Sequence, residues 1–165
     1  MQDWHDIIKQ YNITYIDNFP CPQLPNQLFI TRCSSSKDKD INAGTPKQLY
    51  TSNIIHNFIS FCEKHGFEYA ILSDYEKYGV MFSNEMIENY DIHPSSVSDI
   101  GFRRLGEVVK KRCKEKSINE LYFYNTSPLM SRPYFKMLYY SGIKAFYLTQ
   151  LRVIPKEIPE SLFDF

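Results

Sequence analysis

The sequence predicts an α/β protein: a single Rossmann-like three-layer domain built around a four-stranded, mainly parallel sheet. Short runs rich in aromatic and β-branched residues alternate with longer segments in which apolar residues recur at helical spacing. Strands and helices that alternate in this way form parallel βαβ units with right-handed crossovers. The commonest winding of four such strands covers both faces of the sheet and gives the strand order 2-1-3-4.

Four segments have the length and composition of buried strands. They cover residues 28–33, 69–73, 120–125 and 144–150. The first segment stays apolar until it reaches a run of polar residues beginning at Cys33, as expected of a central strand that ends in a loop. A weaker pattern at residues 13–16 indicates an edge strand.

Helices are predicted from capping residues and from apolar side chains spaced three or four residues apart. The expected helices run from Trp4 to Gln10, from Thr45 to a glycine cap at Gly66, from Ser96 through Lys114, and from about Arg132 to a second glycine cap at Gly142. Ile100 is expected on the apolar side of the third of these helices. The 75–95 connection shows no clear periodicity and is longer than usual, which favours a lid over the site.

The 165 residues fit one domain, with residues 1–26 as an N-terminal extension packed on it. The chain has 19 Lys and Arg residues and 19 Asp and Glu residues, so it exerts no long-range attraction on a polyanion. Any contact with nucleic acid must therefore be local. A basic helix face formed by Arg103, Arg104, Lys110, Lys111 and Lys114 is a candidate, and the alternative is an ordinary solvated face.

The four cysteines are far apart and form no C-x-x-C pair, and no histidines are paired at metal-ligand spacing. We therefore expect no metal and no cofactor. The first residues include charged side chains, and no apolar stretch approaches membrane-spanning length. These features predict a cytoplasmic protein that does not enter a membrane.

Polar side chains follow each predicted strand and should meet at the carboxyl edge of the sheet, where open α/β sheets bind their ligands. The candidates for ligand binding are Ser34, Ser36, Tyr50, Ser73, Tyr78, Tyr90, Asp91 and Asn125. Their tyrosines suit a flat ring, since aromatic faces stack on bases. The loop that supplies Ser34 and Ser36 is rich in hydroxyl donors but lacks the glycine spacing of a P-loop.

Cys33 and Lys37 are the candidate catalytic residues. Only a thiolate is a good nucleophile, and Lys37 with nearby backbone amides would lower the pKa of Cys33 below the roughly 8.5 of a free cysteine. The alternative for Cys33 is a small buried hydrophobe, and the alternative for Lys37 is a surface lysine.

Several short motifs resemble a family of small α/β proteins. These motifs are Cys33-x-x-x-Lys37, Leu49-Tyr50-Thr51-Ser52, Ile71-Leu72-Ser73, Tyr78-Gly79 and Glu88-x-Tyr90-Asp91. The pattern is similar to the core domain of archaeosine synthase, which acts on a 7-deazaguanine nitrile in tRNA, and to domains attached to archaeal tRNA-guanine transglycosylase-like proteins. The resemblance implies a Rossmann-like sheet and a site for a modified purine or another nucleotide base.

Two functions remain open from the sequence. The first is an enzyme that acts on a nucleobase or nucleotide, such as a 7-deazaguanine-type base, at the carboxyl ends of the strands. The second is a non-catalytic module that uses the same crevice or the basic helix face to bind a protein or a nucleic acid.

Overall fold

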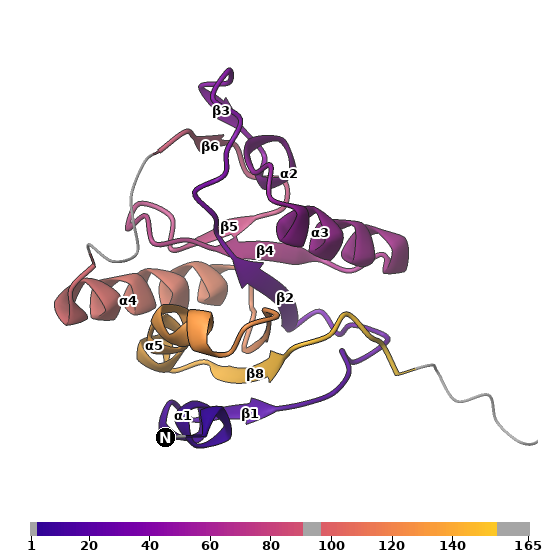
Figure 1. Cartoon of the computed structure of the whole chain (residues 1–165), viewed down its shortest axis with the longest axis vertical. Coiled ribbons are helices and arrows are strands. Elements are labelled where there is room, and N and C mark those ends of the chain that lie inside the picture. The colour runs from indigo at the N-terminus through magenta and orange to yellow at the C-terminus, as the bar shows by residue number, and fades with distance from the viewer. Residues whose placement is uncertain (1–2, 91–96, 155–165) are drawn as a thin grey trace, which may run out of the picture.

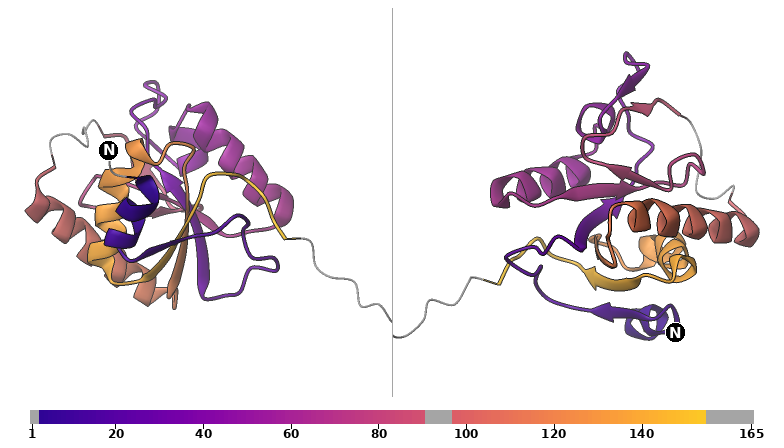
Figure 2. Two further views of the ribbon diagram at one scale, coloured as in Figure 1. Left: turned by 60° about the horizontal axis from the view of Figure 1, so that its bottom comes forward. Right: turned by 180° about the vertical axis from the view of Figure 1, so that it is seen from behind.

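A computed structural model describes residues 3–90 and 97–154 and shows an α/β architecture. A twisted six-stranded sheet forms the middle layer, and helices cover both of its faces (Figures 1 and 2). A separate two-stranded ribbon, β3 (Ala43–Gly44) with β6 (Ile87–Glu88), stands above the sheet in Figure 1.

The large sheet has the strand order β1-β8-β7-β2-β4-β5. Its strands are β1 (Ile13–Tyr15), β2 (Gln27–Arg32), β4 (Tyr69–Leu72), β5 (Val80–Phe82), β7 (Glu120–Tyr124) and β8 (Lys144–Leu148). The prediction of a four-stranded sheet is therefore corrected to six strands. The order 2-1-3-4 predicted for the four strands corresponds to the consecutive strands β4-β2-β7-β8 of the observed sheet. The four predicted strands form the middle of the sheet, and edge strands lie on both sides of them. The edge strand predicted at residues 13–16 is β1, which runs parallel to β8. The other edge strand, β5, runs antiparallel to β4.

The central strand β2 is buried along almost its whole length because both of its neighbours and both helical layers cover it. Phe29 pairs in register with Tyr69 on β4 and with Tyr122 on β7. Its ring also packs against those of Phe19 and Phe67. A strand with apolar side chains on both faces can occupy only the middle of such a sheet.

The helices divide between the two faces of the sheet. They are α1 (Trp4–Gln10), α2 (Pro46–Leu49), α3 (Asn53–His65), α4 (Asp99–Glu115) and α5 (Arg132–Ser141), with a 3₁₀ turn η2 at Leu129–Ser131. In the left view of Figure 2, α3 lies on one face, and α1, α4 and α5 lie on the other. Helices α4 and α5 pack closely at Gly106, where an added Cβ would lie only 2.5 Å from the Cβ of Tyr140.

The continuous helix predicted from Thr45 to Gly66 is broken at Tyr50. Thr45 starts the short α2 with a capping box in which Gln48 accepts a hydrogen bond from the Thr45 backbone. Tyr50 then adopts an extended conformation and forms an isolated antiparallel bridge with Lys37. α3 ends as predicted at a left-handed Gly66. The pairing with the loop after β2 has overridden the helical pattern at Tyr50.

The 75–95 connection is more regular than predicted, because it contains β5 and β6. Ser96 lies outside the described residues, and Ser98 is the cap of α4, accepting a hydrogen bond from the Gly101 amide. Ile100, expected on the apolar side of this helix, is 65% exposed. Within residues 3–90 and 97–154, no helix is long and apolar enough to span a membrane.

Candidate functional site

The carboxyl ends of β2, β4 and β7 bring polar side chains together. Asn125, just after β7, accepts a hydrogen bond from the Nε of Arg32 at the end of β2. The Asn125 amide nitrogen donates to the hydroxyl of Ser131 at 2.7 Å. Asn125 is buried, and its two hydrogen bonds join the end of β2 to the 3₁₀ turn before α5. The site predicted at the carboxyl edge thus has a fixed hydrogen-bonded frame.

Cys33 lies at the centre of this edge and is only 4% exposed. Its thiol donates to the Oδ1 of Asp74 at 3.5 Å, and its Sγ lies 3.2 Å from the hydroxyl of Tyr134 in a hydrogen bond that either group can donate. Asp74 follows β4, and Tyr134 belongs to the first turn of α5. The thiol therefore sits between two polar groups that come from opposite sides of β2.

The surroundings of Cys33 favour the neutral thiol. Burial, followed by the nearby Asp74 carboxylate, raises the pKa of Cys33 to about 11. The expectation that Lys37 lowers this pKa is therefore wrong: the Lys37 ammonium lies instead against the rings of Tyr90 and Tyr50. In this structure, the Cys33 thiol is a neutral hydrogen-bond donor to Asp74.

A chain of hydroxyl groups lies beside Cys33. Ser73 donates to the hydroxyl of Tyr90, which is hydrogen-bonded to the hydroxyl of Tyr50. The Tyr50 hydroxyl in turn donates to the sulfur of Met81 at 3.4 Å. Burial raises the pKa values of Tyr50 and Tyr90, so both phenols stay protonated. We call Cys33, Ser73, Asp74, Tyr50, Tyr90 and Tyr134 the strand-end cluster.

Lys37 reaches the strand-end cluster through the bridge that breaks the predicted helix. The amide of Asp38 donates to the carbonyl of Leu49, and the amide of Thr51 donates to the carbonyl of Ser36. These bonds hold the loop after β2 against the start of α3. The Lys37 Nζ consequently lies 4.1 Å from the centre of the Tyr90 ring, a cation–π contact.

A pocket of about 430 Å³ opens next to this contact, and we call it the strand-end pocket. It is lined by Ser35, Lys37, Lys39, Asn89 and Tyr90. The Asn89 amide nitrogen is held by the carbonyls of Asp38 and Ile41, which fixes that wall. The pocket therefore combines two ammonium groups, a hydroxyl and an aromatic ring.

Comparison with known proteins adds no assignment to this geometry. No protein-family model, no curated protein and no solved structure matches the chain. Among the residues that the structure describes, no group of three or more His, Cys, Asp and Glu side chains is arranged to hold a metal ion.

The other predicted site residues lie in different places. Ser34 is half-buried and its hydroxyl accepts a hydrogen bond from the Ser36 amide, so both serve the loop itself; it is Ser35 that lines the pocket. Tyr78 is buried, and its ring packs edge-on against Tyr75 instead of lining the pocket. Asp91 lies outside the described residues.

Sequence reasoning did not assign Tyr134 to the site. The signal that could have found it is its position in the first turn of the helix after β7, because the helix that follows a parallel strand begins at the carboxyl edge of the sheet. Asp74 is the second residue after β4, and its distance from Cys33 along the chain hid the contact between them.

Proposed function

We propose that the strand-end pocket binds a nucleobase or a nucleotide. The observation that carries the proposal is the Lys37 ammonium lying over the Tyr90 ring in the wall of the pocket. An aromatic face suits a flat heterocycle, and the ammonium groups of Lys37 and Lys39 suit a phosphate. The resemblance of the sequence motifs to those of archaeosine synthase makes a 7-deazaguanine-type base a ligand to test early.

Lys37 has a specific part in this proposal. Its ammonium covers one face of the Tyr90 ring, and the Tyr75 ring lies 5.0 Å from Tyr90 at an interplanar angle of 50°. A heterocycle that stacks on the face covered by Lys37 takes the place of the ammonium. The phosphate of the same ligand then offers Lys37 a charged partner, so a nucleotide should bind more tightly than its nucleoside.

Isothermal titration calorimetry with guanosine 5′-monophosphate and guanosine tests the proposal. Lys37→Met should weaken the monophosphate at least tenfold and leave guanosine nearly unchanged, since only the phosphate needs the ammonium. Tyr90→Leu should weaken both ligands, whereas Tyr90→Phe keeps the ring and should retain binding. Lys64→Met, at the exposed end of α3, is the control for loss of charge.

The proposal fails if neither the monophosphate, guanosine nor a 7-deazaguanine base binds to the wild-type protein at millimolar concentration. It also fails if Lys37→Met and Lys64→Met bind the monophosphate equally well. Thermal unfolding of each variant checks that the fold is intact.

A second candidate function is catalysis through Cys33, and the observation that favours it is the Asp74 carboxylate positioned to accept the thiol proton. Because burial and Asp74 raise the pKa of Cys33 to about 11, the thiol is protonated at pH 7. Catalysis therefore requires that the ligand raise the thiolate population. Iodoacetamide labelling of Cys33 should be slow and independent of Lys37, and acceleration by the bound nucleotide would support the enzyme over the binding module.

A further inference from the structure

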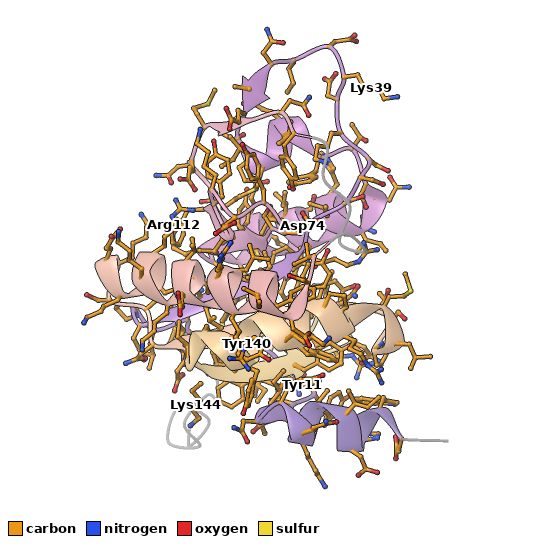
Figure 3. The ribbon with its side chains drawn as sticks, turned by 90° about the vertical axis from the view of Figure 1, so that its left-hand side faces the viewer. Tyr11, Lys39, Asp74, Arg112, Tyr140 and Lys144 are labelled. Carbon is orange, nitrogen blue, oxygen red and sulfur yellow. The ribbon has the colours of Figure 1, made fainter. Side chains whose placement is uncertain are left out.

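Tyrosines and basic side chains share one exposed surface, far from the strand-end pocket. It crosses α1, α5 and α4, and Figure 3 shows it from the front with Tyr11 and Tyr140 labelled. We define the aromatic-basic face by Tyr11, Tyr139, Tyr140, Arg103, Lys110 and Lys114. These residues come from three helices that adjoin on the same side of the sheet.

The aromatic part is a continuous row of rings. The Tyr11 ring of the α1 cap lies 5.9 Å from that of Tyr139, and the Tyr139 ring lies 5.4 Å from that of Tyr140. The guanidinium of Arg103 then lies 5.4 Å from the centre of the Tyr140 ring. Tyr139 is 43% exposed, so its ring offers apolar surface to a partner.

The basic part follows the edge of α4 that faces α5. Arg103, Lys110 and Lys114 are seven and four residues apart, which places them in one line along the helix. At a rise of about 1.5 Å per residue, this line is roughly 16 Å long. Glu107 is the acidic residue in the same line, so the line carries three positive charges and one negative charge.

The line ends in a concave surface. A groove of about 500 Å³ lies between the end of α4 and the turn from α5 into β8, and its lining includes Lys110, Lys114 and the apolar Ile118 and Ile143. Lys144 also lines it, although the Lys144 ammonium lies over the Phe146 ring at 5.3 Å. Among the described residues, neither Lys110 nor Lys114 forms an ion pair.

From this arrangement, we infer that the aromatic-basic face binds a single-stranded nucleic acid. Exposed rings stack on bases whatever their sequence, and a line of cations follows the phosphates of the backbone. A protein partner has less support, because an acidic peptide would use the cations but would leave the tyrosine rings without a stacking partner. The chain has no net charge, so the attraction depends on this local line.

This inference extends beyond the strand-end pocket and does not depend on it. The pocket is proposed to hold a single nucleotide, whereas the aromatic-basic face would hold a strand. A Lys37→Met variant should therefore lose free nucleotide and retain the strand. If the wild-type protein binds the strand but not the free nucleotide, the pocket proposal has failed. If it binds the free nucleotide but not the strand, the inference about the aromatic-basic face has failed.

Fluorescence anisotropy with 5′-labelled 12-nucleotide oligo(dT) and oligo(U), measured from 50 to 200 mM NaCl, tests the inference. The triple variant Arg103→Gln, Lys110→Gln, Lys114→Gln should reduce the slope of log K against log salt by about 2, at about 0.7 per phosphate contact on a single strand. Lys47, Lys64 and Lys77 are exposed lysines on elements outside the aromatic-basic face, and replacing them together by Gln is the matched control.

Tyr139 tests the stacking part separately. Tyr139→Leu should weaken binding about tenfold or more at every salt concentration with an unchanged slope, while Tyr139→Phe should bind like the wild type. The inference is overturned if the two triple variants have the same slope, if Tyr139→Leu binds like Tyr139→Phe, or if a 12-residue oligoglutamate binds as tightly as the oligonucleotides. Circular dichroism confirms that each variant is folded.

Discussion

Tyrosines in the strand-end cluster and on the aromatic-basic face have opposite environments. Tyr50 is completely buried, and its hydroxyl lies between Tyr90 and Met81. Tyr139 is 43% exposed, and its ring makes T-shaped contacts with the rings of Tyr11 and Tyr140. The hydroxyl group matters in the first case because a buried polar group needs a partner, whereas only the ring matters in the second.

The basic side chains differ in the same way. Lys37 packs over a ring inside a pocket wall, and Arg103 packs over a ring on an open helix surface. Substitutions in the strand-end cluster should therefore change stability as well as binding. Substitutions on the aromatic-basic face should change binding alone, except where the helices that carry the face pack together.

Gly106 is that exception and should give the largest effect. In Gly106→Val, a Cβ would lie 2.7 Å from the carbonyl carbon of Tyr140, so α4 and α5 must separate. We expect a loss of about 3 kcal/mol in the free energy of unfolding, as for severe overpacking. Urea denaturation measures it, and Glu107→Ala on the exposed side of α4 should change stability by less than about 0.5 kcal/mol. If Gly106→Val and Glu107→Ala changed the free energy of unfolding equally, the close packing of α4 and α5 would contribute little to stability.

The Cys33 thiol should make stability depend on alkaline pH. Its folded-state pKa of about 11 lies above the roughly 8.5 of a free cysteine, so its contribution to stability is complete below about pH 8.5 and is lost as the pH rises through 11. The corresponding loss of stability is on the order of 2–3 kcal/mol. Urea melts from pH 8 to 11 should show that Cys33→Ala loses less stability than the wild type over this range. Parallel pH curves for the two proteins would contradict the buried thiol.

Replacement of Asn125 should cause the next largest loss of stability. Asn125→Ala removes the acceptor of the Arg32 Nε and the donor to Ser131, leaving buried polar groups to find new partners. We expect a loss of about 2 kcal/mol, within the range for unsatisfied groups. The measurement is the urea midpoint, with the exposed Thr126→Ala as control. A loss no greater than that of the control would mean that water replaces the amide without cost.

The smallest effect sharpens the comparison between the two tyrosine environments. Tyr50→Phe removes a buried hydroxyl and should cost about 1 kcal/mol, because the Tyr90 hydroxyl loses a partner. Tyr139→Phe removes an exposed hydroxyl and should leave stability unchanged. Thermal unfolding of the two variants measures this difference in stability. Equal melting temperatures would show that the buried Tyr50 hydroxyl contributes no more to stability than the exposed Tyr139 hydroxyl.

Much of the fold was predictable because burial and capping leave local signals. The continuous apolar run of β2, the capping box at Thr45 and the glycine caps at Gly66 and Gly142 each need only a few neighbouring residues to be recognised. β5 was missed because Val80–Phe82 is short and lies inside a segment without periodicity. Its assignment depends on pairing with β4, which is a non-local contact.

The candidate site was predictable in position but not in electrostatics. The polar residues after β2, β4 and β7 identify the carboxyl edge, because parallel strands share it. The sign of the Cys33 pKa shift could not be read from Lys37 four residues away. It depends on Asp74 and on burial, and both follow from how β4 and α5 pack around the thiol.

The edge strand β1 has a consequence for how the protein is made. β1 comes from the start of the chain but pairs with β8, close to its end, with Ile13 opposite Ala145. On the ribosome, α1 and β1 emerge well before β8, since Ile13 precedes its partner Ala145 by 132 residues, and they have no strand to pair with until β8 has been synthesised. The apolar surface of Ile7, Ile8 and Ile13 stays uncovered during that interval, so this segment is where a nascent-chain chaperone would be most useful.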